Sequence, residues 1–220
     1  MKASKPKLWI DWATHEAAKY AVMNWHYSKT MPKSKLVKFG VWENDIFIGA
    51  VIYGLGANCN LSKIIGMESN QVCELVRVAL NKHEHAVTKI IAITINKLKI
   101  FCPGIEAIIS YADRDQGHEG VIYQAGNWQK IGGLVTDEHY LLFGKKIHPK
   151  TVGDRYGTRS IPWIKKNVDP NIKKIKTKGK YRYIYPISKR AKHRVDVLCD
   201  QQRKGSSSLT RTLQNPKTKT

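Results

Sequence analysis

Apolar residues in the middle of the chain follow the spacing of a strand, a helix and a second strand. Val72 to Leu80 has the composition of a strand, with two charged residues among apolar ones. In the segment after it, one helical face collects Val87, Ile90, Ile91, Ile95 and Leu98. Ile105 to Ala112 is almost continuously apolar, which is typical of a central strand covered on both faces. The pattern predicts an α/β core.

The flanking segments extend this layout. Thr14 to Asn24 has the start signal and apolar spacing of a short amphipathic helix. A turn at Glu43-Asn44-Asp45 separates two apolar runs, as in a β-hairpin. A short helix is expected at Val121 to Ala125, and strands near Trp128 to Ile131 and His139 to Phe143. We therefore expect an α/β (α+β) fold, with a mixed central sheet flanked by helices and a basic C-terminal extension.

Charge divides the chain unequally. Residues 1–144 contain 16 Lys and Arg against 13 Asp and Glu, whereas residues 145–220 contain 22 against 4. We expect a catalytic α/β domain at 1–145, a basic DNA-contacting extension packed on it at 146–188, and a basic, disordered tail at 189–220.

A basic segment of this kind favours a polyanionic partner, because Lys and Arg that neutralise phosphates release condensed counterions. Double-stranded DNA is the leading candidate, and a membrane surface is disfavoured because the basic segment has no sustained apolar face. The N-terminus has no apolar secretion signal, so we expect a cytoplasmic protein. The residues expected to contact nucleic acid are basic or aromatic: Lys29, Lys33, Arg155, Tyr156, Arg159, Lys165, Lys180 and Arg182.

Two segments have the composition of a reaction site. Asp113 follows the predicted central strand, with His118 close behind it, so this loop could supply a general base or metal ligands. The alternative is a hydrogen-bonded turn in which Asp113 caps a short helix. His26 and Tyr27 follow the first helix and could stack on a base, transfer a proton or bind a metal, although a structural histidine is the commoner explanation.

Two further places carry charge near the predicted core. Glu74 and Arg77 are three residues apart in a strand, so regular alternation would turn them to opposite faces. Lys82, Thr88 and Lys89 lie around the start of the predicted second helix, where backbone amides attract phosphate and a cofactor could bind.

Several motifs in one order resemble a known family. They are Trp25-His26-Tyr27-Ser28-Lys29, Cys73 to Val78, Tyr111-Ala112-Asp113 with Gln116-Gly117-His118, Gly120 to Ala125 with Asn127-Trp128, and Arg155 to Ser160. Together they look like the Mom-type phage DNA-modification proteins, which are similar to the GNAT acyltransferases. The resemblance implies a transferase that converts adenine in DNA to its methylcarbamoyl form and so protects phage DNA from host restriction enzymes.

The resemblance also implies where the site lies. It places His26 and Tyr27 near the adenine or a metal, Asp113 as base or ligand, and Tyr123 in the acyltransferase-like site. Arg77, Ser110 and His118 are second-rank candidates. Acetyl-CoA and iron are implied as cofactors, yet the loop that normally wraps the CoA pyrophosphate contains no glycine here, between Asn81 and Thr88.

Two other functions stay open at this stage. One is a GNAT-type acetyltransferase acting on another amine. The other is a non-catalytic DNA-binding protein, for which the sequence shows no helix-turn-helix or zinc-finger spacing.

Overall fold

The computed structural model describes residues 6–55, 60 and 62–213, from residue 205 onward by backbone alone. The chain divides into two compact units. Unit 1 contains residues 1–110, 120–132 and 182–220, and unit 2 contains residues 111–119 and 133–181. The sequence suggested consecutive segments at 1–145, 146–188 and 189–220, whereas the two compact units interleave along the chain.

A mixed seven-stranded sheet organises unit 1. The strands are β1 (Leu8–Trp12), β2 (Leu36–Glu43), β3 (Ile46–Gly54), β4 (Val72–Leu80), β5 (Ala107–Asp113), β6 (Gln129–Lys130) and β10 (Lys180–Pro186). Their order is β1-β2-β3-β4-β5-β10-β6. Neighbours from β1 to β4 pair antiparallel, β4 and β5 pair parallel, and β10 and β6 pair antiparallel. The expected α/β class with a mixed sheet is confirmed.

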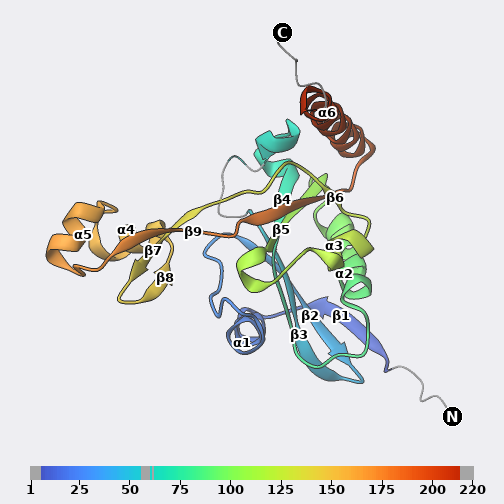
Figure 1. Ribbon diagram of the computed structural model, residues 1–220. Helices are drawn as coiled ribbons and strands as arrows, with labels where there is room; N and C mark the ends of the chain where they lie inside the picture. The colour runs from blue at the N-terminus through green and yellow to red at the C-terminus, as the bar shows by residue number, and fades with distance from the viewer. Residues whose placement is uncertain (1–5, 56–59, 61, 214–220) are drawn as a thin grey trace, which may run out of the picture. The chain divides into compact units, whose positions relative to one another are not determined.

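Helices cover the two faces of this sheet (Figure 1). Helix α1 (His15–Trp25), capped by Thr14, packs its small side chains against Ala50, Ile52 and Ala79. Helix α2 (Val87–Phe101) lies on the opposite face, where the Tyr53 hydroxyl is 2.7 Å from Thr94 Oγ1. Neighbouring strand residues point to opposite faces, which is why Ile52 and Tyr53 meet different helices. The short helix α3 (Val121–Ala125) follows β5 along the chain.

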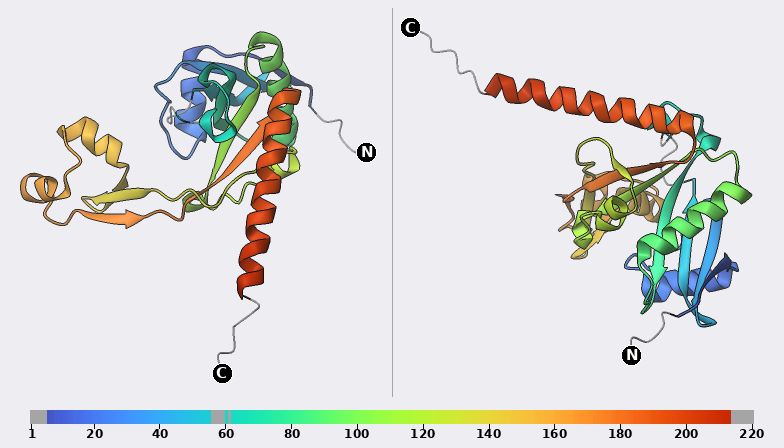
Figure 2. Two further views of the ribbon diagram at one scale, coloured as in Figure 1. Left: turned by 90° about the horizontal axis from the view of Figure 1, so that it is seen from above. Right: turned by 90° about the vertical axis from the view of Figure 1, so that its right-hand side faces the viewer.

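Helix α6 (Lys189–Leu213) ends the described part of unit 1 and forms one continuous helix (Figure 2). The sequence predicts a disordered tail at residues 189–220 instead. Ala191 and Val195, four residues apart, are completely buried and anchor the first turns, while Arg190 pairs with Glu106. A pattern of only two buried apolar residues is too short to reveal a helix in such a basic sequence. Residues 214–220 lie outside the described part of the chain.

The described residues between β3 and β4 include two 3-10 helices, η1 (Ser62–Ile65) and η2 (Ser69–Gln71). Arg194 of α6 donates hydrogen bonds to the carbonyls of Ile65 and Gly66. No helix in the described ranges is both long and apolar enough to cross a bilayer.

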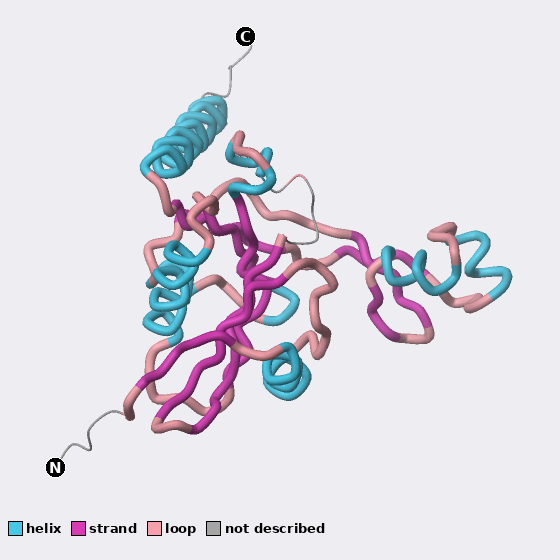
Figure 3. Tube along the Cα trace, turned by 180° about the vertical axis from the view of Figure 1, so that it is seen from behind, coloured by secondary structure: helices cyan, strands magenta, loops and turns pink. Residues whose placement is uncertain are grey.

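Unit 2 has a small core of its own, and its helices and strands are seen as cyan and magenta tubes in Figure 3. After the 3-10 helix η3 (Arg114–Gln116), three antiparallel strands, β7 (Glu138–Leu142), β8 (Lys145–Ile147) and β9 (Lys173–Lys176), form a sheet in the order β8-β7-β9. Helices α4 (Pro149–Tyr156) and α5 (Ile161–Asn167) pack on it. The buried residues of this core are Tyr140, Leu142, Val152, Ile164 and Ile172.

Helices α4 and α5 are joined by four residues, and we call them the α4–α5 helix pair. Gly157 ends α4 in the left-handed conformation with φ 72°, and Ser160 caps α5 through the Trp163 amide. The Gly and Pro residues of this segment stand at the positions where the helices end and begin.

Candidate active site at the end of the parallel ladder

A β-bulge in β4 changes which side chains face helix α1. Ile52 of β3 is paired with Arg77 and Tyr53 with Leu75, so Val76 has no cross-strand partner. Glu74 is paired with Gly54 and Arg77 with Ile52, and these two residues of β3 share one face. The extra residue in β4 therefore puts Arg77 on the same face as Glu74. The expectation that Glu74 and Arg77 point to opposite faces is wrong, because regular alternation is interrupted between them.

The parallel pairing of β4 and β5 ends at Glu74 and Ile109. Directly beyond this ladder end, the Ser110 hydroxyl lies 3.0 Å from the Leu75 carbonyl oxygen and 2.7 Å from the Tyr123 hydroxyl. Ser110 has one proton and the carbonyl can only accept. If Ser110 donates to Leu75, Tyr123 must donate to Ser110; if Ser110 donates to Tyr123, the phenol keeps its own proton for a ligand. The pair can therefore offer either a proton or a lone pair.

Aromatic packing fixes Tyr123 in position. Its ring stacks on Tyr183 with centroids 5.0 Å apart and contacts Trp128 at 5.1 Å. Burial raises the pKa of Tyr123 to about 12; the Ser110 hydrogen bond opposes this rise, and nearby Tyr27 adds to it. The phenol is therefore protonated at neutral pH.

The loop after α1 is held close to β4. Arg77 donates to the Thr30 carbonyl from Nε at 3.3 Å and from Nη2 at 3.2 Å. Burial lowers the pKa of Arg77, while Tyr27 and Glu74 counteract this shift. Tyr27 is half exposed, and its electrostatic interactions reach both Arg77 and Tyr123. Unit 1 thus gathers four predicted site residues, Tyr27, Arg77, Ser110 and Tyr123, near the ladder end.

His26 lies at the end of α1 with a defined tautomer. The Ser28 backbone amide, 3.1 Å away, donates to Nδ1, and the Ser28 hydroxyl is 2.8 Å from the same atom. An amide can only donate, so Nδ1 accepts and the neutral ring carries its proton on Nε2. The ring lies 4.3 Å from that of Tyr27. His26 is therefore arranged to donate from Nε2.

Asp113 and His118 belong to unit 2. The Asp113 carboxylate accepts from the Asp115 amide at 3.0 Å, capping η3, and lies 3.7 Å from Lys180 Nζ. The backbone of exposed His118 donates to the Asp113 carbonyl. The capped turn that the sequence offered as an alternative is present, and a role of Asp113 as base or ligand stays a prediction.

The implied iron has no ligand cluster in the described residues. Across residues 6–55, 60 and 62–213, no three His, Cys, Asp or Glu side chains are close enough together to hold a metal ion. The three residues named as possible ligands are divided, with His26 and Tyr27 in unit 1 and Asp113 in unit 2.

The loop between β4 and α2, where the resemblance would place the CoA pyrophosphate, is already occupied by a carboxylate. Buried Glu43 accepts from the Glu84 amide at 3.0 Å and the His85 amide at 2.9 Å. Burial raises the pKa of Glu43, but these two amides, with help from His85 and His83, outweigh it and lower the pKa overall. A pyrophosphate would compete for the same amides against a fixed negative charge. The loop does not fit CoA in the usual acyltransferase manner.

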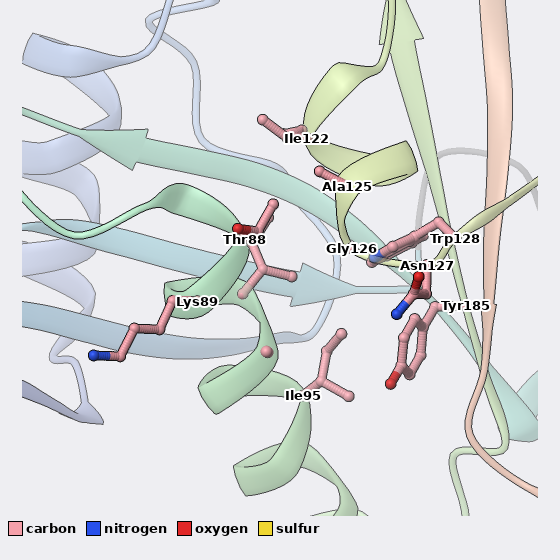
Figure 4. Close-up of a pocket in the computed structure, with 11 residues that line it drawn as sticks. Thr88, Lys89, Ile95, Ile122, Ala125, Gly126, Asn127, Trp128 and Tyr185 are labelled. Carbon is pink, nitrogen blue, oxygen red and sulfur yellow. The ribbon is translucent and has the colours of Figure 1, made fainter.

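A pocket of about 330 Å³ lies beside this loop, between α2 and the segment after α3 (Figure 4). Of the expected cofactor residues, Thr88 and Lys89 line it, whereas Lys82 is exposed and does not. Its other lining residues are mainly apolar or aromatic: Ile91, Ala92, Ile95, Ile122, Ala125, Gly126, Asn127, Trp128 and Tyr185. Such a lining suits an apolar or flat group better than a phosphate.

The residues expected to contact nucleic acid fall into both units. Lys29, Lys33 and Arg182 lie in unit 1, and the other five lie in unit 2. Five of the eight are exposed: Lys29, Lys33, Arg155, Arg159 and Lys165. Tyr156 packs against the unit 2 core instead, and Lys180 pairs with Asp113.

Comparison with known proteins agrees with the resemblance seen in the sequence. A curated relative, the methylcarbamoylase Mom of Escherichia phage Mu, is 25% identical over 186 residues, which cover 82% of this chain and 76% of the relative. A Bacillus subtilis acetyltransferase in complex with CoA is similar at a TM-score of 0.46 and 12% identity, covering 84% of this chain and 100% of that one. A Staphylococcus aureus Mu50 N-acetyltransferase is similar at 0.46 and 14%, covering 82% and 98%. The Mom protein family model matches residues 7–204, and the chain therefore belongs to that family.

Proposed function

We propose that this Mom-family enzyme is a transferase that converts adenine in double-stranded DNA to N6-methylcarbamoyladenine. In this proposal it acts on phage DNA in the host cytoplasm and protects it from restriction. The observation that carries the proposal is the family match over residues 7–204, and the curated relative is a methylcarbamoylase. The basic C-terminal third supports a DNA substrate, because 22 Lys and Arg stand against 4 Asp and Glu there.

The ladder end suits the acceptor side of such a reaction. Acylation of the adenine amine requires the N6 atom to be held in position and to give up a proton. When Tyr123 donates to Ser110 and Ser110 donates to the Leu75 carbonyl, the Tyr123 oxygen is left to accept a hydrogen bond from that amine. Tyr123 is protonated at neutral pH, so we assign it a positioning role rather than that of the base. Arg77 adds positive charge to the ladder end while its guanidinium donates to the carbonyls of Thr30 and Val76.

Mass spectrometry of nucleosides tests this proposal. DNA from cells expressing the full chain should contain a modified deoxyadenosine, and Tyr123→Phe should lower its amount by roughly tenfold or more, because a misplacement of about 1 Å at a reacting group can cost about 10²-fold in rate. Tyr20→Phe is the matched control, because Tyr20 is 55% exposed on α1. Unmodified DNA from cells expressing the wild type would refute the proposal.

Asp113→Asn separates the two interpretations of Asp113. Asparagine still offers an oxygen to the Asp115 amide, so the cap is retained while the charge is lost. Loss of product in a variant with unchanged thermal stability would support a base or ligand, whereas retained product would leave Asp113 as a cap alone.

A further inference from the structure

The outer surface of the α4–α5 helix pair combines positive charge with one exposed aromatic ring. Residues 145–180 contain 12 Lys and Arg against 2 Asp, a net charge of +10. Each helix buries one side chain completely, Val152 in α4 and Ile164 in α5. Trp163 is 45% exposed. The exposed basic residues of the pair and its connection are Lys150, Arg155, Arg159, Lys165 and Lys166.

The backbone of Trp163 is fixed although its side chain is exposed. Its amide donates to the Ser160 cap, and its carbonyl accepts from the Asn167 side chain at 2.8 Å. Ile164, the next residue, is fully buried in the unit 2 core. Two hydrogen bonds and a core contact therefore fix a segment whose indole ring is partly exposed to solvent.

The connection between the helices is fixed as well. The Tyr140 hydroxyl of β7 donates to the Arg159 carbonyl at 2.9 Å. The Arg159 side chain crosses α4 over Gly153, where a Cβ atom would lie 3.0 Å from Arg159 Nε. The guanidinium is thus held against the helix beside the exposed surface.

We propose that the α4–α5 helix pair binds duplex DNA and that Trp163 inserts between base pairs as an apolar wedge. This inference rests on the proposed function, which requires adenine to leave the stack. The Lys and Arg side chains of this surface would bind DNA phosphates. An indole ring interacts weakly with phosphates and strongly with the flat faces of bases. Apolar side chains that enter a base step partially unstack it and kink the duplex. A tryptophan side chain has only two rotatable torsions, so on a fixed backbone it loses little conformational entropy on insertion.

Fluorescence anisotropy with two labelled duplexes tests the wedge in the full-length protein. One duplex is intact and the other contains a single abasic site, where part of the unstacking cost is already met. The wild type should bind the abasic duplex more tightly. Trp163→Ala should weaken that binding roughly tenfold, because removing a stacking ring costs about 1–3 kcal/mol per base, and Trp163→Phe should stay within about threefold of the wild type.

Two further variants complete the design. Trp9→Ala is the matched control, because Trp9 is 52% exposed on β1 in unit 1, and it should bind as the wild type does. Lys165→Ala with Lys166→Ala should weaken both duplexes equally and reduce the dependence on salt, whereas Trp163→Ala should leave the salt dependence unchanged. Thermal unfolding of each variant identifies any that fail to fold. If Trp163→Ala does not fold, the binding of Trp163→Phe is compared with that of the wild type instead.

Each outcome decides the inference. Loss of abasic preference in Trp163→Ala supports the wedge. If Trp163→Ala binds both duplexes as the wild type does while the double lysine variant is weakened, the pair contacts only the backbone and the wedge is refuted. If neither variant is weakened, the surface serves another partner, such as a protein. Because these assays measure binding alone, modified nucleosides from the wild type with normal Trp163→Ala binding would overturn only this inference.

Discussion

Glu43 should stabilise the protein well beyond what its single charge suggests. Its side chain is 7% exposed, and its carboxylate accepts from the amides of Glu84 and His85. Glu43→Ala removes both bonds and leaves the amide of buried His85 without its acceptor. Hydrogen bonds to a charged group contribute about 1.5–3 kcal/mol each, and the Glu84 amide can recover part of this from water. We expect a loss of about 2–4 kcal/mol, which at about 2–4 °C per kcal/mol for a chain of this size lowers the melting temperature by about 4–16 °C.

Thermal and guanidinium unfolding monitored by circular dichroism would measure this change. Glu138→Ala is the matched control, because Glu138 pairs with Lys174 on the exposed surface, where solvent screens the pair and its loss should change stability little. The pKa of Glu43 is lowered in the folded protein, so its contribution is present above the ordinary value of 4.5 and is lost as the pH falls through the lowered pKa. A Glu43→Ala variant no less stable than Glu138→Ala would refute this account of the loop.

Gly120→Ala should cost about 2–4 kcal/mol, because Gly120 has φ 81° and an added Cβ would lie 2.4 Å from the Tyr183 ring; Gly117→Ala, with φ 72° and open space, should cost only about 1 kcal/mol in the same melts. Similar losses for the two variants would contradict the steric argument. Burial lowers the pKa of both His139 and His148, with nearby lysines adding to the effect, so folding keeps these rings neutral where unfolded ones would be protonated. Unfolding should therefore become easier as the pH falls below about 6.5, a trend that replacing both histidines with Gln should flatten and that a flat wild-type profile would disprove.

The α/β core was predictable because its signals are local. The apolar face of the segment from Val87 to Leu98 and the apolar run ending at Ala112 each specify one element, and the structure has α2 and β5 there. Features that depend on a single inserted residue were not predictable. The bulge at Val76 turns Arg77 to the face of Glu74, and nothing in the local composition marks it.

The candidate site was predictable only in part, for a related reason. Tyr123 and Ser110 were both named from the sequence, but their hydrogen bond joins residues from a helix and a strand that only the fold brings together. Glu43 was read as part of a turn, since its partners Glu84 and His85 are distant in sequence. Sequence patterns predict which face of a helix or strand is buried far better than they predict which distant residues it contacts.

The strand order has a consequence for how the chain folds during synthesis. Strand β10 lies between β5 and β6, yet β5 ends at Asp113 and β10 begins only at Lys180. On the ribosome, the growing chain therefore holds β5 with one unpaired edge while the intervening residues are made, roughly 3–13 s at ordinary elongation rates. An apolar strand with a free edge is a template for intermolecular pairing. Nascent chains stalled before residue 180 should consequently be the form of this protein that most needs a chaperone.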